Sequence, residues 1–205
     1  YANGTMGDWG VHWLDQILWW SGEKGPKKVF CTGGRNIAGP AVLNDQEQTT
    51  DAPDHQMATF EFEQFTATWE HRKFADNNNE KHKIGCYFYG EKGVLHIGWR
   101  DGWTFYPVDP KSGEKHGNHQ LQEPDGHNIA LLWADFIDAI EKKRPPVADN
   151  AAAHRSSCLP LLGMISHKAG RSIQWDAEKE QIVGDAEAAK LMRREYRGEW
   201  KYPIA

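Results

Sequence analysis

The strongest constraint on this fold is a change of hydrophobic period along the chain. Residues 5–20 carry apolar side chains at i, i+3 and i+7, which is the spacing of one helix face. Between residues 56 and 107 apolar and polar side chains alternate instead, as they do in half-buried strands. Residues 129–140 return to the helical spacing. Helices on both sides of a run of strands predict the α+β class.

The predicted architecture is a large open, mostly antiparallel β-sheet with helices covering one face. We expect five or six strands in one sheet and a single domain over residues 1–205, which leaves the second sheet face for substrate or another subunit. The polar stretch from Arg35 to His55 is too long for an ordinary connection, which suggests a functional role. The expected helices cover 5–20, the segment ending at Pro145-Pro146, the segment from an Asp149 cap to Gly170 with a bend at Pro160, and a short segment after Gly184-Asp185.

Composition excludes several classes of protein. The net charge is −5 and the longest basic block is Lys142–Arg144, so the electrostatic footprint of a nucleic-acid binder is missing. No apolar run reaches the roughly 18 residues of a membrane span. The three cysteines lie far apart and no H-E-x-x-H or C-x-x-C motif occurs, so we expect no metal site.

The chain contains ten tryptophans, with six tyrosines and eight phenylalanines. So many large rings suggest a thick core, a sugar-stacking surface or a subunit interface. In the first predicted helix, Trp9, Trp13, Trp19 and Trp20 widen the apolar stripe.

One constellation in the first predicted helix could carry chemistry. Asp8, His12 and Asp15 stand at i, i+4 and i+7, on one face and away from the apolar stripe. A neutral imidazole can accept a hydroxyl proton near neutral pH, and a carboxylate one turn away can orient it. The nearby glycines, Gly10 among them, would allow close approach of a ligand. The alternative is that Asp8 caps the helix and His12 is a surface residue.

These residues also carry a family resemblance. The segment Gly4–Asp15 reads GTMGDWGVHWLD and resembles the G-x-x-x-D-x-G-x-H-x-x-D segment that opens the second domain of the Gfo/Idh/MocA oxidoreductases, such as glucose–fructose oxidoreductase and inositol dehydrogenase. The resemblance extends along essentially the whole chain. It includes TWEHR at 68–72, DNAAAHR at 149–155, GRSIQWD at 170–176, GDAEA at 184–188 and REYR at 194–197.

The resemblance implies the substrate-binding and catalytic half of an NAD(P)-dependent oxidoreductase acting on a sugar or polyol hydroxyl. Members of the family pair an N-terminal Rossmann domain with an α+β domain. Carried over, His12 would exchange the proton of the reacting hydroxyl, and Asp8 would orient His12 or bind the adjacent hydroxyl. Asp15 would hold the helix by local hydrogen bonding or touch the substrate.

Three further residues are candidates for substrate binding. His127 precedes the apolar helix, where a ligand could lie, although helix capping would explain it equally well. His154 stands near a helix start, where intramolecular pairing is the alternative. Arg72 and Trp69 point to opposite sheet faces, and a subunit interface is the preferred interpretation for both.

The cofactor is expected to come from outside this sequence. The chain has no G-x-G-x-x-G after a strand, because Gly33-Gly34 is followed by no amphipathic helix. NAD or NADP would therefore be bound mainly by a Rossmann domain in cis or in trans, and the chain alone should be inactive. We also expect a homo-oligomer formed through the open sheet face. The compartment stays open between the cytoplasm and the bacterial periplasm.

Two other functions remain open at the level of sequence. A cofactor-free sugar lyase or hydrolase would use Asp8 and His12 as an acid–base pair without hydride chemistry. A non-catalytic module would bind carbohydrate or pair subunits through its tryptophan-rich sheet.

Overall fold

The structure is a computed structural model that describes residues 3–75, 81–99, 102–117, 124–194, 196 and 198–201, with the side chains of residues 124–127 left out. The chain divides into two compact units, which are taken separately below: residues 1–75 with 153–205, and residues 76–152. The helices are α1 (Gly4–Ser21), α2 (Pro124–Lys142), α3 (Asn150–Ala169) and α4 (Ala186–Lys190), with a 3-10 turn at Pro110–Ser112. The strands are β1 (Lys28–Gly34), β2 (His55–Glu61), β3 (Thr66–Arg72), β4 (Gly85–Gly90), β5 (Gly93–Gly98), β6 (Trp103–Pro107), β7 (Lys115–Gly117), β8 (Ile173–Asp176) and β9 (Gln181–Val183).

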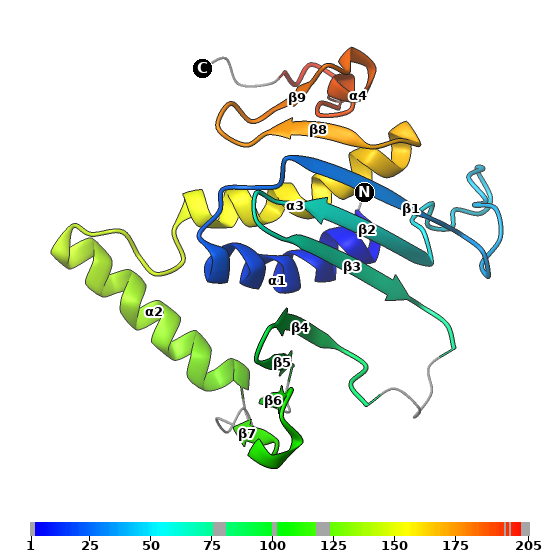
Figure 1. Cartoon of the computed structure of the whole chain (residues 1–205). Helices are drawn as coiled ribbons and strands as arrows, with labels where there is room; N and C mark the ends of the chain where they lie inside the picture. The colour runs from blue at the N-terminus through cyan, green and yellow to red at the C-terminus, as the bar shows by residue number, and fades with distance from the viewer. Residues whose placement is uncertain are drawn as a thin grey trace. The chain divides into compact units, whose positions relative to one another are not determined.

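A five-stranded sheet forms the centre of the first unit (Figure 1). Its strand order is β3-β2-β1-β8-β9, and every neighbouring pair is antiparallel. The alternation expected in residues 56–72 is present, because β2 buries Gln56, Ala58 and Phe60 while Met57 is exposed. One face of this sheet is therefore buried and the other open. The α+β class and the open antiparallel sheet are confirmed.

Helices α1 and α3 supply the core that covers the buried sheet face. The two helices approach closely through small residues: a Cβ on Gly10 would lie 3.4 Å from the Cβ of Pro160, and one on Gly163 only 2.7 Å from the sulfur of Met6. Position 10 therefore requires a small residue because α3 packs against it. The expectation that Gly10 makes room for a ligand is wrong. The core residues are Met6, Leu14, Ile17, Leu18, Val29, Cys31, Ala58, Phe60, Phe62, Trp69, Leu159, Leu162, Ile173, Trp175, Ile182 and Ala188.

A buried serine connects α3 to the sheet. The hydroxyl of Ser166, which is fully buried, accepts the backbone N–H of Cys31 at 2.9 Å and donates to the carbonyl of Arg171 at 2.8 Å. The ladder between β1 and β8 covers only the first two residues of β1, so the Cys31 N–H takes this side-chain acceptor in place of a strand partner.

We expect Ser166→Ala to lower the free energy of unfolding by about 1–3 kcal/mol, because it leaves a buried N–H without its acceptor. Urea denaturation measures the change. Ser157→Ala is the matched control: it removes an exposed hydroxyl of the same helix, which donates only to the carbonyl of Ala153, and should shift stability by less than about 0.5 kcal/mol. Equal losses for the two variants would contradict the assignment.

The second unit has its own sheet, with strand order β4-β5-β6-β7 and antiparallel pairing throughout. The strands that the alternation predicts up to residue 107 are present, but among the described residues β4, β5 and β6 do not join β2 and β3 in one sheet, so the expectation of a single sheet is wrong. Alternation identifies the face of a strand and not its neighbour, which explains the error. The single domain over residues 1–205 stays a prediction.

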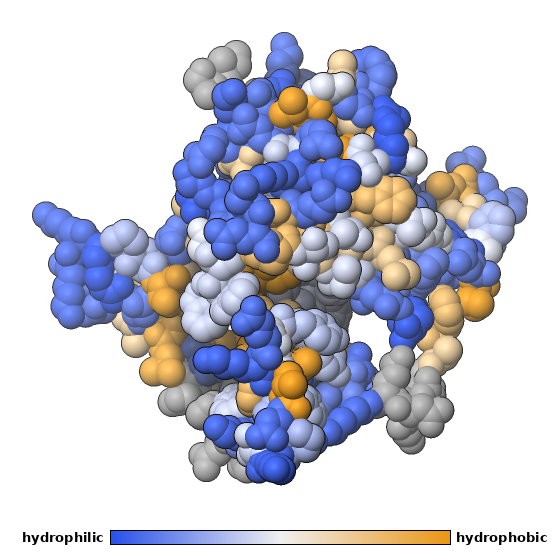
Figure 2. Space-filling model, in the orientation of Figure 1, coloured by the Kyte–Doolittle hydropathy of each residue, from blue (hydrophilic) through white to orange (hydrophobic). Residues whose placement is uncertain are grey.

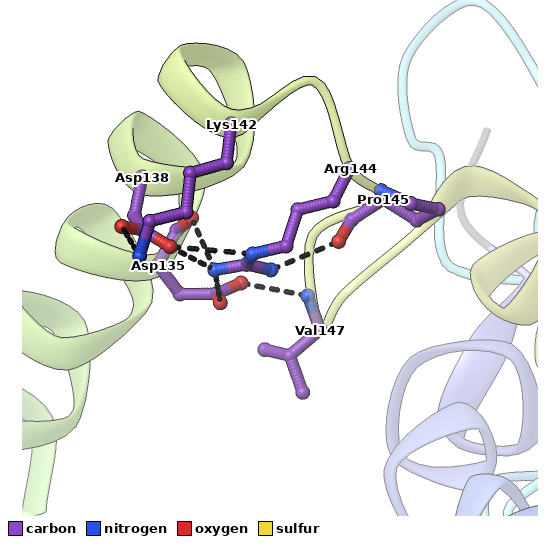
Figure 3. Close-up of polar contacts among 6 residues, drawn as sticks. All are labelled: Asp135, Asp138, Lys142, Arg144, Pro145 and Val147. Carbon is purple, nitrogen blue, oxygen red and sulfur yellow. Dashed lines mark hydrogen bonds and ion pairs between the residues drawn. The ribbon is translucent and has the colours of Figure 1, made fainter.

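Helix α2 ends in a network of charged side chains (Figure 3). Arg144 donates to the carboxylates of Asp135 at 2.7 Å and Asp138 at 2.6 Å, and Lys142 pairs with Asp138. The backbone N–H of Val147 also donates to Asp135, and this bond, followed by that of Arg144, lowers the pKa of Asp135. The network fixes the segment that follows α2.

The opposite side of α2 is apolar, as Figure 2 shows along the helix. This stripe has the predicted helical spacing, and its side chains are exposed: Ile129, Leu132, Trp133, Phe136, Ile137 and Ile140. Within the described part of the chain, no helix is long and apolar enough to cross a membrane.

The long polar segment between β1 and β2 is ordered by one buried carboxylate. Asp54 accepts the consecutive backbone N–H groups of Asn36, Ile37 and Ala38 at 2.8–3.0 Å. These bonds, that of Ala38 first, lower the pKa of Asp54. A buried ionised side chain with three donors explains how a long connection without strands or helices keeps a defined shape.

The C-terminal motifs build a hairpin and a capped helix. The guanidinium of Arg171 binds both carboxylate oxygens of Asp185 at 2.8 Å, and Asp185 also caps α4 by accepting the N–H of Ala188. Asp176 accepts two N–H groups in the turn between β8 and β9. The short helix after Gly184 is confirmed, whereas strands β7, β8 and β9 were not predicted.

Candidate functional site

Helix α1 carries the candidate catalytic residues on its solvent side. Asp8, His12 and Asp15 are all exposed, whereas Met6 and Leu14 are buried against the core. This division follows the sequence pattern, because the polar residues fall at i, i+4 and i+7 and the apolar ones on the opposite side. The structure therefore brings the three predicted side chains onto one accessible face.

Asp8 does not cap α1. The helix begins at Gly4, with Asn3 at the N-cap position, so Asp8 lies in the second turn. The side-chain oxygen of Asn3 accepts a hydrogen bond from Arg194 at 2.7 Å and makes no cap bond. The capping alternative for Asp8 is therefore wrong, and its carboxylate stands one turn before His12. Although both residues are described, no hydrogen bond joins Asp8 to His12 in this structure.

Asp15 is held by a residue far away in the sequence. The hydroxyl of Ser156, which is buried in α3, donates to the carboxylate of Asp15. The expectation that Asp15 bonds locally within its helix is wrong, because its partner lies 141 positions along the chain. The contact fixes α1 on α3, and it leaves the second carboxylate oxygen of Asp15 able to accept another donor.

Arg72 lies on the sheet face opposite to α1. In β3 the buried residues Trp69 and His71 face the core that α1 covers, and Arg72 points to the open side, where it pairs with Glu70. The structure does not bring Arg72 to the face of Asp8 and His12. Trp69 belongs to the core, so the interface interpretation of that residue is wrong.

His154 does not join Asp8 and His12 in the described structure. The imidazole of His154 bonds the carboxylate of Glu180 at 3.0 Å, which is the intramolecular pairing that the sequence left as the alternative. His154 and Ser156 are two positions apart on α3, so they point in nearly opposite directions, and Ser156 is the one that reaches Asp15. His127 falls in the first turn of α2, where its side chain lies outside the described residues.

One buried histidine was not singled out from the sequence. The indole N–H of Trp69 donates to Nδ1 of His71 at 3.0 Å, so Nδ1 keeps its lone pair and the neutral ring carries its proton on Nε2. Burial lowers the pKa of His71 to about 4, against a smaller opposite effect of the Pro53 carbonyl. The sequence could have identified His71 as buried, because the alternation in β3 places it on the same face as Trp69.

The described residues hold no group of three His, Cys, Asp or Glu side chains able to bind a metal ion. The cysteines are free thiols, and burial raises the pKa of Cys31 and of Cys86 to about 11, so neither is an activated nucleophile. The chemistry available on α1 is therefore that of an imidazole with neighbouring carboxylates.

The first unit is an α+β unit whose first helix exposes an Asp–His pair, and comparison with family models identifies its family. Residues 1–96 match the GFO/IDH/MocA C-terminal domain, and residues 116–202 match the oxidoreductase family C-terminal alpha/beta domain. The chain belongs to the Gfo/Idh/MocA oxidoreductase family, as its C-terminal part. No curated protein matches the sequence.

Several solved structures share the fold. Levoglucosan dehydrogenase in complex with NADH and levoglucosan is 16% identical, with a TM-score of 0.64 over 85% of this chain and 51% of its own. An oxidoreductase domain protein from Kribbella flavida is 16% identical, with a TM-score of 0.62 over 89% and 51%. An Agrobacterium radiobacter oxidoreductase in complex with NAD+, L-tartaric acid and magnesium is 11% identical, with a TM-score of 0.58 over 82% and 48%. The chain spans about half the length of these proteins.

Proposed function

We propose that this chain is the substrate-binding and catalytic half of an NAD(P)-dependent oxidoreductase acting on a sugar or polyol hydroxyl. The observation that carries the proposal is the pair of Asp8 and His12, one turn apart on the exposed face of α1, within a segment that belongs to the family's C-terminal domain. Levoglucosan dehydrogenase, which has the same fold and a sugar derivative as ligand, supports the substrate class.

The described residues do not form a dinucleotide cradle. Gly33 and Gly34 end β1, but the chain continues into the irregular segment ordered by Asp54 and not into a helix, so no helix N-terminus faces these glycines. A Rossmann domain, in cis or in trans, would bind the NAD or NADP. The nicotinamide ring of the bound cofactor would accept the hydride.

The residues of α1 would perform the proton chemistry. A neutral His12 accepts the proton of the reacting hydroxyl, so that the carbon–oxygen bond can become a carbonyl as the hydride departs. Asp8 orients the imidazole once substrate draws the two side chains together, or accepts the neighbouring hydroxyl. Asp15, fixed by Ser156, stands one turn further along as a second acceptor.

A reduction assay tests the proposed function. The chain, combined with a family Rossmann domain, is given NAD+ or NADP+ and a panel of sugars and polyols, and cofactor reduction is followed by absorbance. We expect reduction with at least one substrate. Conversion of a sugar without cofactor would favour a lyase or hydrolase, and sugar binding without any conversion would favour a non-catalytic module; either result would overturn the redox function.

We further propose that the open face of the five-stranded sheet joins subunits. This face exposes Phe30 and Met57, which are 42% and 49% accessible, between the ion pairs Lys28–Glu61 and Glu70–Arg72. An apolar centre with a charged rim is the usual anatomy of an interface. We expect Met57→Arg to weaken self-association at least tenfold in sedimentation velocity, because it would bury an unpaired charge. Leu43→Arg, an exposed apolar residue outside the sheet, is the control and should leave association unchanged.

A further inference from the structure

The exposed face of α1 extends past the Asp–His pair to a tryptophan. Asp8, His12, Asp15 and Trp19 follow one another at i, i+4, i+7 and i+11, which is the spacing of a single helix face. Trp19 is 82% exposed, more than any other large hydrophobic side chain among the described residues. The expectation that Trp19 widens the apolar stripe is therefore wrong.

The other tryptophans of α1 have packing roles that separate them from Trp19. Trp9 and Trp13 pack against the hydrophobic core. Trp20, the immediate neighbour, makes an edge-to-face contact with Phe65 at 5.8 Å between ring centroids. Trp19 takes no part in that core, although an indole is costly to leave in water. Its position on the Asp8–His12 face suggests a ligand as the missing partner.

The spacing along α1 fixes which part of a ligand Trp19 can reach. Trp19 lies seven positions after His12, a rise of about 10 Å along the helix. This distance is longer than one pyranose ring. A disaccharide whose first ring reacts at His12 would therefore place its second ring near the indole. Between them, the carboxylate of Asp15, held by Ser156, can accept sugar hydroxyls.

We propose that Trp19 forms a subsite for a second sugar ring, and that the substrates are disaccharides or other glycosides in preference to free monosaccharides. The inference rests on the proposed function, because it places the reacting ring at His12. An indole offers a broad apolar surface to the C–H face of a pyranose and loses little conformational entropy when it does so.

Equilibrium binding tests the subsite without turnover. Glucose, maltose and cellobiose are titrated by calorimetry into the wild-type chain, Trp19→Ala and Trp19→Phe. We expect at least one disaccharide to bind about tenfold tighter than glucose. Trp19→Ala should remove this preference and leave glucose binding unchanged, and Trp19→Phe should restore part of it. Trp200→Ala removes another exposed indole, 74% accessible, and is the matched control.

The results that would overturn the subsite differ from those that would overturn the proposed function. The subsite is overturned if no sugar binds, if the preference survives in Trp19→Ala, or if that variant loses glucose and disaccharide binding equally. An assay that shows no cofactor reduction while the Trp19-dependent preference holds would overturn the redox function alone. Oxidation of glucose and of disaccharides with equal efficiency, unaffected by Trp19→Ala, would overturn the subsite alone.

Discussion

Replacing His12 with alanine is expected to lower the turnover number for sugar oxidation by about 10²–10⁴-fold, the usual contribution of a positioned general base. The imidazole is exposed on α1 and belongs to no core contact, so its removal should not unfold the chain. The Michaelis constant should change much less than the turnover number, because the proton is transferred mainly in the transition state. Steady-state kinetics with the cofactor-loaded enzyme measures both constants.

A second histidine variant controls for the effect of removing an imidazole outside the candidate site. His116 is exposed on β7 and bonds Thr104 at 3.0 Å, and His116→Ala should retain the wild-type turnover number. Thermal melts of both variants check that each is folded. A His12→Ala enzyme with more than half of the wild-type turnover number would remove His12 from the mechanism, and the Asp8–His12 spacing would then be a coincidence of helix geometry.

The candidate site could be predicted from sequence because it lies within one helix. The boundaries of α1 differ by one residue at each end from the prediction, and the face shared by Asp8 and His12 follows from spacing alone. The same holds for the Asp149 cap of α3, where the carboxylate accepts the N–H groups of Ala151 and Ala152. Features set by a few consecutive residues are encoded locally.

Features that depend on distant residues could not be read in this way. The hydrogen bond between Ser156 and Asp15 forms because α1 and α3 pack together at Gly10 and Gly163. No local sequence pattern predicts that the two helices pair. The division into two sheets depends on strand neighbours, which alternation does not specify. The exposure of Trp19 depends on which side of α1 the core takes, so the sequence suggested a wider apolar stripe.

Protonation of His71 is expected to destabilise the chain below neutral pH. The folded-state pKa is about 4, against about 6.5 for an unperturbed histidine. Above about pH 6.5 the ring is neutral in both states and the residue has no effect on stability. As the pH falls from 6.5 to 4, the unfolded state binds a proton that the folded state does not, so stability is lost. The loss reaches about 3 kcal/mol at pH 4, because each pKa unit corresponds to about 1.4 kcal/mol.

The variant His71→Asn isolates this contribution from that of the carboxylates. The amide oxygen of asparagine can accept the indole N–H of Trp69 as Nδ1 does, but the side chain does not titrate. Urea denaturation at intervals from pH 7.5 to 4.5 gives the free energy of unfolding of both proteins. The variant should be less stable at pH 7.5, because it leaves a small cavity, and should lose less stability on acidification than the wild type. Parallel pH profiles for the two proteins would mean that His71 is protonated in the folded state as easily as in water, and that its burial does not control the acid stability of the fold.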